Sequence, residues 1–209
     1  MIVNLVLLLV FITVTLLLTR EGLWSAMLMF LNVLVAATVA TAWFGVLTVS
    51  LEKLVPSSLE KLVPSYTFLL DFLSMWGIFS IVLLALREIT DRVSRTKVKF
   101  LRQIELCGAP IVALLSGWVM VAFTATSLHT AAVPRWLVQE TPQARMFFGL
   151  SPDRKWLSWM RNSSLDGPFA WPGNNERAIF DKDADFILRY ADRRFKLEGE
   201  EALRVNAKQ

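Results

Sequence analysis

Two ionisable residues lie in or at the end of long apolar stretches, where they could carry chemistry. Asp71 lies about one helical turn inside the third apolar stretch, and His129 ends the fourth. An ionisable side chain in a membrane is costly and is therefore a candidate for ion or proton passage. Because both residues fall at the same expected depth, we predict that they pair. The structural alternatives are an Asp71 that reaches water or caps a neighbour, and an interfacial His129.

Other residue types that carry chemistry are few. Glu105, at the entry to the fourth stretch, is the third candidate polar residue. A single cysteine, Cys107, excludes an intrachain disulfide, and a single histidine disfavours a histidine-rich metal site. Phosphate-loop, nucleophile-elbow and metalloprotease motifs are absent, as is a basic-aromatic stripe typical of nucleic-acid binding. We therefore predict no catalytic residues, no metal, no cofactor and no nucleic-acid partner.

Aspartates near the end of the chain alternate like the start of a calcium loop. Asp181, Asp183 and Asp185 have this spacing, and Asp192 stands in the twelfth position. However, the sixth position is Phe186 where the sharp turn needs glycine, and the twelfth lacks the usual glutamate. Acidic residues at a helix start also favour the helix dipole and its cap, which is the interpretation we prefer.

The elements that position these residues are apolar helices. Apolar residues make up 55% of the 209-residue chain, the mean hydropathy is +0.48, and the apolar residues gather before Pro134. A hydrocarbon core of about 30 Å needs roughly 20 helical residues. We predict an all-α polytopic membrane protein with a transmembrane domain over residues 1–134 and a small, mainly helical polar tail over 135–209. The expected spans are 2–19, 23–47, 67–86 and 104–129.

The first span could instead be a signal peptide. A signal peptide has basic residues before its apolar core and small residues after it. Here nothing basic precedes Ile2, whereas Arg20 and Glu21 follow the apolar run, so we predict a retained helix.

An excess of basic over acidic residues flanks the spans on one side only, since the two lysines of residues 50–65 are balanced by two glutamates. Short cytoplasmic loops beside spans are enriched in Lys and Arg, so these residues predict that both chain ends face away from the cytosol. The topology-setting residues are Arg20, Arg87, Arg92, Arg95, Lys97, Lys99 and Arg102.

Small residues recur every four positions in two spans. Ala109, Ala113 and Gly117 share one helix face in the fourth span, and Ala36 and Ala40 do so in the second. Such faces let helix backbones approach closely. We predict that the fourth-span face packs on a helix of the same chain, of a partner membrane protein or of a second copy. For the second span, the common occurrence of Ala in spans is an equal alternative.

Residues 50–65 hold a tandem repeat of Ser-Leu-Glu-Lys-Leu-Val-Pro-Ser. Each unit offers a Ser cap, one apolar turn and a Pro stop. We predict short interfacial helices with Leu51, Leu54, Leu59 and Leu62 in lipid, the alternative being a duplication in a tolerant loop. In the tail we predict one helix beginning at Ser151-Pro152-Asp153 and a second over about 183–197.

This layout resembles the CvpA (colicin V production protein) family of bacterial inner-membrane proteins. The matching residues are Arg20 and Gly22 in the first turn, and Glu105, Gly108 and Gly117 in the last span. The resemblance covers about residues 1–134. It implies a bacterial inner-membrane protein tied to toxin production, secretion or envelope maintenance.

Three functions follow as hypotheses. The leading one is a non-enzymatic scaffold or accessory, with lipid bilayer and membrane-protein partners, whose N-terminus and tail are periplasmic. The alternative is a small transporter or channel subunit in which Asp71 lines a polar path. A membrane-embedded hydrolase would need paired carboxylates or a Ser/His dyad at one depth, which the spans do not offer.

Overall fold

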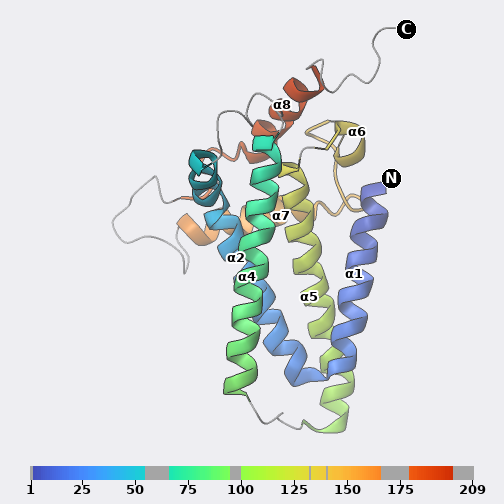
Figure 1. Ribbon diagram of the computed structural model, residues 1–209. Helices are drawn as coiled ribbons and strands as arrows, with labels where there is room; N and C mark the ends of the chain where they lie inside the picture. The colour runs from blue at the N-terminus through green and yellow to red at the C-terminus, as the bar shows by residue number, and fades with distance from the viewer. Residues whose placement is uncertain are drawn as a thin grey trace, which may run out of the picture.

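The computed structural model of the protein describes residues 2–54, 66–94, 100–131, 133–139, 141–165 and 179–199. Four long helices form a bundle (Figure 1). All four are long and apolar enough to cross a membrane, which confirms the predicted all-α, four-span architecture. They are α1 (Ile2–Glu21), α2 (Leu23–Leu54), α4 (Tyr66–Val93) and α5 (Arg102–Thr130).

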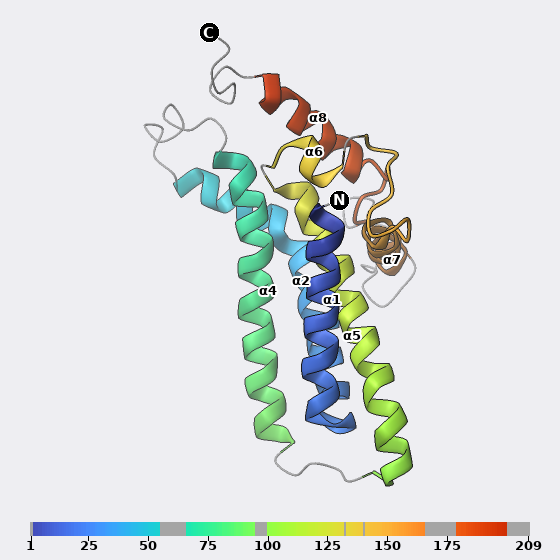
Figure 2. The ribbon, with the colours of Figure 1, turned by 90° about the vertical axis from the view of Figure 1, so that its right-hand side faces the viewer.

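The two ends of the bundle differ in charge and in the elements they carry. One end, which we call the basic end, holds the turn between α1 and α2 together with the C-terminal end of α4 and the start of α5 (Figure 1). The opposite end, the tail end, holds the N-terminus and the helices that follow α5 (Figures 1 and 2). The basic end carries Arg20, Arg87, Arg92 and Arg102. Arg95, Lys97 and Lys99 lie outside the described residues.

The turn between α1 and α2 takes a single residue. Gly22 has φ +89°, a left-handed conformation that costs glycine little and other residues more. A Cβ at this position would also lie 3.0 Å from the Glu105 Oε1 atom. Gly22 therefore permits both the tight reversal and the approach of α5.

Helices α2 and α4 extend beyond the predicted spans. The α2 helix continues to Leu54, and the Ser50 hydroxyl donates to the Val46 carbonyl at 2.9 Å. Ser50 thus lies within a helix and does not start a separate interfacial one, because the preceding apolar turns propagate through it. Leu51 and Leu54 belong to α2, whereas Leu59 and Leu62 lie outside the described residues.

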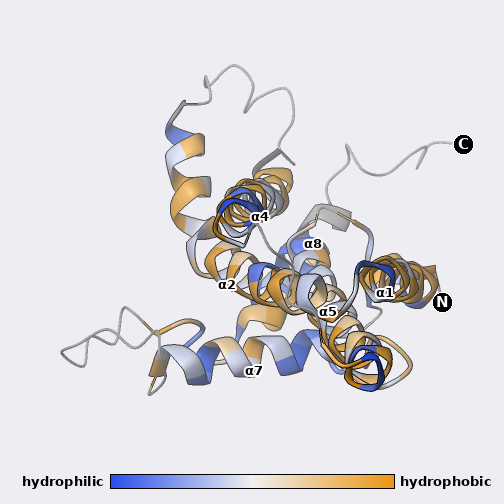
Figure 3. Cartoon of the chain, turned by 90° about the horizontal axis from the view of Figure 1, so that it is seen from below, coloured by the Kyte–Doolittle hydropathy of each residue, from blue (hydrophilic) through white to orange (hydrophobic). Residues whose placement is uncertain are grey.

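The bundle surface is apolar, as a lipid-facing surface must be. Helix α1 exposes large aliphatic side chains along its length, and Leu9 is 66% exposed. Seen along the bundle, the spans consist mostly of hydrophobic residues (Figure 3). In water this much exposed apolar surface would be strongly unfavourable, so the shell fits a membrane protein.

Three shorter helices follow α5: α6 (Arg135–Val138), α7 (Pro152–Leu165) and α8 (Phe186–Gly199). Helix α7 begins at Pro152, where Ser151-Pro152-Asp153 predicts a start, and it lies across the bundle. It is seen end-on in Figure 2 and lengthwise in Figure 3.

The tail helices share a hydrophobic core with the spans. Buried side chains of α2, α4 and α5, such as Phe79 and Phe123, form one cluster with five tail residues. The tail members are Trp156, Leu157, Met160, Phe186 and Tyr190. About 75 residues of such low apolar content form a marginal core alone, and this shared cluster supplies the missing apolar surface.

Candidate functional site

The small-residue faces bring helices together within the chain. Ala109 and Ala113 are buried on α5, and a Cβ at Gly117 would lie 2.6 Å from the Thr15 Oγ1 atom. The same Cβ would lie 3.2 Å from the backbone oxygen of Phe11, so α1 occupies this face. Within the described chain the face is therefore covered, and we do not propose it as a surface for a partner.

The second small-residue face lies at the centre of the bundle. Ala36 and Ala40 of α2 are completely buried. They belong to the cluster that contains Met75 and Phe79 of α4 and Phe123 of α5. The aromatic rings of Phe79 and Phe123 stack there with centroids 4.7 Å apart. Small residues on α2 thus make room for large residues on α4 and α5.

Asp71 is buried at the tail end and bound by helix α8. Its Oδ2 atom accepts hydrogen bonds from the Arg193 Nη1 atom at 2.7 Å and the Tyr190 hydroxyl at 3.1 Å. The Asp71 side chain is 7% exposed and that of Arg193 is 37% exposed. An opposite charge and a hydroxyl donor stabilise a carboxylate that would otherwise be costly to bury. Asp71 therefore anchors α8 to the start of α4.

His129 is completely buried and contacts two tail helices, α7 and α8. Its Nε2 atom lies 3.0 Å from the Asp153 Oδ2 atom of α7. Its Nδ1 atom lies 3.4 Å from the Arg194 Nη2 atom of α8, and Arg194 is 3% exposed. The C-terminal end of α5 thus meets the first turn of α7 and the middle of α8 through one imidazole.

The structure gives Asp71 and His129 separate partners, so the predicted pairing between them is wrong. Each residue binds a charged residue of the tail, because α7 and α8 fold back over the end of the bundle. Matching depth in the spans alone does not reveal these partners, because they come from helices more than 20 residues away along the chain. The sequence holds a signal for these partners. One helical face of the tail carries three hydrogen-bond donors that need acceptors, namely Tyr190, Arg193 and Arg194.

Two tryptophans complete the polar contacts beneath the tail. The Trp156 Nε1 atom of α7 donates to the Thr41 hydroxyl of α2 at 3.1 Å. The Trp76 Nε1 atom of α4 donates to the Ser127 hydroxyl of α5 at 3.0 Å. Each indole keeps its hydrogen-bond donor satisfied while its ring fills the core.

We call the set Asp71, His129, Asp153, Tyr190, Arg193 and Arg194 the docking network. Its chemistry is limited by access, since the His129 and Asp153 side chains are 0% and 1% exposed. A substrate or a travelling ion needs an open route to such groups. In this conformation the network can hold helices together.

Burial changes the pKa of Tyr190, a tail residue of the network. Burial, followed by the nearby Asp71 carboxylate, raises the pKa of the Tyr190 hydroxyl. A neutral Tyr190 can donate to Asp71, whereas a tyrosinate could only repel it. The contact is therefore intact at neutral pH.

The aspartates with calcium-like spacing have a structural role in the described chain. The Asp181 Oδ1 atom accepts hydrogen bonds from the amides of Asp185 and Phe186, at 3.0 and 3.1 Å, where α8 begins. Burial raises the pKa of Asp181, and the Arg189 guanidinium lowers the pKa of Asp185. Among the described residues, no group of three or more His, Cys, Asp or Glu side chains converges on a metal-sized site.

The basic end carries a separate polar cleft of about 330 Å³ between α2 and α4. Asn32 donates to the Thr90 hydroxyl at 3.1 Å, and the Trp24 Nε1 atom donates to the Ser94 hydroxyl at 2.7 Å. No pattern in the sequence predicts this pair of contacts. Glu105 and Cys107 are exposed at the same end of the bundle, so Glu105 is not enclosed among the spans.

Comparison with known proteins adds no relative. No protein-family model, curated protein or solved structure matches this chain.

Proposed function

We propose that the protein is a non-enzymatic scaffold or accessory of the bacterial inner membrane. The observation that carries this proposal is the docking network, in which Asp71 and His129 of the spans hold the tail helices on the bundle. A cap fixed in this way presents a defined surface outside the membrane. Such a surface suits the recruitment of envelope or secretion components.

The resemblance to the CvpA family gives the proposal its biological setting. It implies a role in colicin V production or secretion, or in maintenance of the cell envelope. The residues that carry the resemblance are Arg20 and Gly22 in the first turn, and Glu105, Gly108 and Gly117 in the last span.

Charge asymmetry supports the proposed orientation. The described basic residues Arg20, Arg87, Arg92 and Arg102 lie at the end opposite the tail. By the positive-inside rule that end is cytoplasmic, which puts the N-terminus and the tail in the periplasm.

The contacts of Asp71 favour docking over a transport path. A carboxylate that lines a path must exchange partners with a passing ion, whereas the Asp71 Oδ2 atom holds both Arg193 and Tyr190. A transporter would still be recognised by its activity. Purified protein in liposomes would show a flux that Asp71→Asn abolishes.

Recovery of partners from native membranes tests the scaffold proposal. We expect chemical crosslinking followed by purification to recover the same envelope proteins with the natural chain and with Gly77→Ala. Gly77 is a suitable control because a Cβ there meets nothing within 4 Å. Asp71→Ala should loosen α8 and reduce that recovery severalfold. Equal recovery with Asp71→Ala, or a liposome flux that depends on Asp71, would reject the scaffold role.

A further inference from the structure

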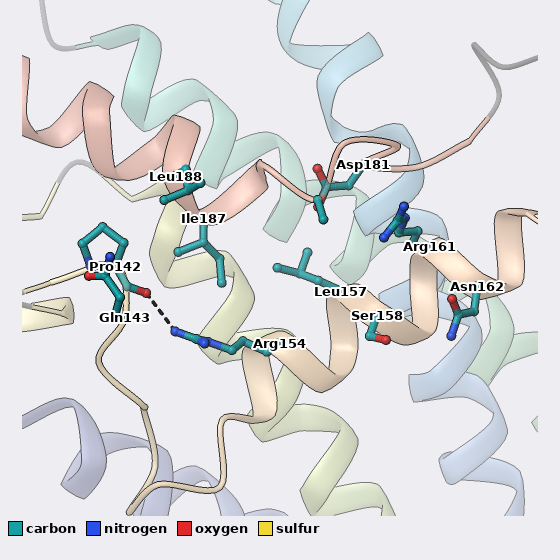
Figure 4. Close-up of a pocket in the computed structure, with 11 residues that line it drawn as sticks. Pro142, Gln143, Arg154, Leu157, Ser158, Arg161, Asn162, Asp181, Ile187 and Leu188 are labelled. Atoms are coloured by element: carbon teal, nitrogen blue, oxygen red, sulfur yellow. Dashed lines mark hydrogen bonds between the residues drawn. The ribbon is translucent and has the colours of Figure 1, made fainter.

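A groove of about 450 Å³ lies between α7 and α8 (Figure 4). One side of α7 supplies two arginines two helical turns apart, with Ser158 and Asn162 beside them (Figure 4). The opposite wall is apolar and comes from Ile187 and Leu188 of α8. The groove thus combines cationic and neutral hydrogen-bond donors with an apolar wall.

The two arginines, Arg154 and Arg161, are not neutralised by the described part of the chain. The Arg154 Nη2 atom donates to the carbonyls of Pro142 and Ala144, at 2.8 and 3.4 Å, and neither carbonyl carries a net charge. The Arg161 Nε atom is buried and has no hydrogen-bond partner in that part of the chain. A buried donor without a partner is costly, so an acceptor in the groove would be stabilising.

Asp181 also borders the groove, but its carboxylate is directed to the start of α8. Its Oδ1 atom already accepts from the amides of Asp185 and Phe186. The two guanidinium groups therefore outweigh the one carboxylate, and the groove favours an anion. Arginine forks match phosphate oxygens especially well.

The depth of the groove indicates where that anion comes from. Trp24 and Trp43 of α2 are separated by about 28 Å along a helix, close to the thickness of the hydrocarbon core. Helix α7 is tied to α2 two residues before Trp43, by the bond from Trp156 to Thr41. Helix α7 is thus at the depth of lipid headgroups.

We propose that this groove binds the phosphate group of a membrane phospholipid. Arg154 and Arg161 donate charge-assisted hydrogen bonds to the phosphate oxygens, with Ser158 and Asn162 as neutral donors. Leu157, Ile187 and Leu188 contact the glycerol and the first methylene groups. This binding site goes beyond the scaffold role and does not depend on it.

Lipid retention by the purified full-length chain tests the proposal. Native mass spectrometry should show retention of phosphatidic acid and much weaker retention of diacylglycerol, which has the same chains without phosphate. Arg161→Gln should lower the affinity for phosphatidic acid by about tenfold or more, because it removes a charge-assisted contact. Arg189→Gln is the matched control, since Arg189 lies on α8 and its Nη2 atom is paired with Asp185. Equal retention of the two lipids, or no effect of Arg161→Gln, would overturn the proposal.

A second measurement uses the unaltered chain and so does not depend on the folding of a variant. Phenylglyoxal modifies accessible arginines, and peptide mapping reports each site. Phosphatidic acid should slow the modification of Arg154 and Arg161 and leave Arg189 unaffected. Inorganic phosphate alone should protect the two arginines less. Equal protection by inorganic phosphate would contradict a lipid ligand, and absence of protection by either would contradict a phosphate site.

Discussion

Asp71 joins a membrane-spanning helix to a helix of the tail through charge. Its Oδ2 atom binds Arg193 at 2.7 Å and Tyr190 at 3.1 Å in a largely dehydrated position. Removal of one member of such a pair leaves the other polar group desolvated without its partner. Single residues at the tail end therefore decide whether α8 stays on the bundle.

Asp71→Ala is predicted to lower the free energy of unfolding by about 1–3 kcal/mol, the usual penalty for leaving a buried polar group without its hydrogen-bond partner. The partial exposure of Arg193 keeps the loss below that of a fully buried pair. Thermal unfolding in detergent measures it. A double-mutant cycle with Arg193→Gln should give a coupling energy clearly above zero, and additive effects would mean that the ion pair contributes nothing.

We predict that α8 loses its hydrogen bond from Tyr190 to Asp71 at alkaline pH, when the Tyr190 hydroxyl ionises. The pKa of its hydroxyl is raised in the folded chain from the ordinary value of 10.0, so folding favours the protonated form. The stabilisation of the folded chain by protonated Tyr190 is complete below the pKa of tyrosine in the unfolded chain. It is lost as the pH rises from that value through the pKa of Tyr190 in the folded chain. Ultraviolet absorbance of tyrosinate in the Tyr66→Phe variant reports Tyr190 alone, since the chain has two tyrosines. Ionisation of Tyr190 near the ordinary pKa in the folded protein would show that the hydroxyl is not buried against Asp71.

At the scale of elements, the pair α1 and α5 depends on close backbone approach. Gly117 is the tightest point, because a Cβ there meets Thr15 and the backbone of Phe11. Backbone cannot move aside as a flexible side chain can, so the glycine fixes the distance between the two helices. The α2–α4 interface does not depend on such close backbone approach. Small residues of α2 there make room for aromatic rings of α4.

Gly117→Ala is predicted to destabilise the protein by about 1–3 kcal/mol, the range for overpacking of a close-packed site. The gain of about 0.5–1 kcal/mol from replacing glycine by alanine within a helix offsets only part of this. Thermal unfolding in detergent provides the measurement. Gly77→Ala supplies the comparison, because a Cβ there meets nothing within 4 Å and only the helix gain should be seen. The α1–α5 interface would be wrongly assigned if both variants gained stability.

At the scale of the whole molecule, one bundle carries its own extramembrane cap. Asp71 lies near the start of α4 and His129 near the end of α5. The tail supplies their partners, which are Asp153 of α7 and Tyr190, Arg193 and Arg194 of α8. The tail has too little apolar area to form a core alone, so the spans supply apolar surface for it to bury. The span ends carry buried polar groups, and the tail supplies their partners. Folding of the cap and assembly of the bundle are thus coupled.

Topology gives the prediction for the whole molecule. A phosphatase fused after Gln209 should be active in intact bacterial cells, whereas a fluorescent protein that folds only in the cytosol should stay dark there. The same reporters placed in the 95–99 region should give the opposite result. Fluorescence from the fusion after Gln209 would show that the C-terminus is cytosolic and would contradict the proposed orientation.

The sequence alone determined the architecture of the membrane domain. Uninterrupted apolar runs of span length can only be satisfied as helices in lipid. The Ser-Pro-Asp sequence also predicted the start of α7, and small residues four positions apart predicted the small-residue faces of α2 and α5. The tertiary structure decided which groups meet. Asp71 and Tyr190 are 119 positions apart, and His129 and Arg194 are 65 apart. Such contacts depend on how α7 and α8 fold back over the bundle, which local pattern does not encode. Hence Asp71 and His129 were found as costly buried polar residues, and only the folded chain showed that the tail supplies their partners.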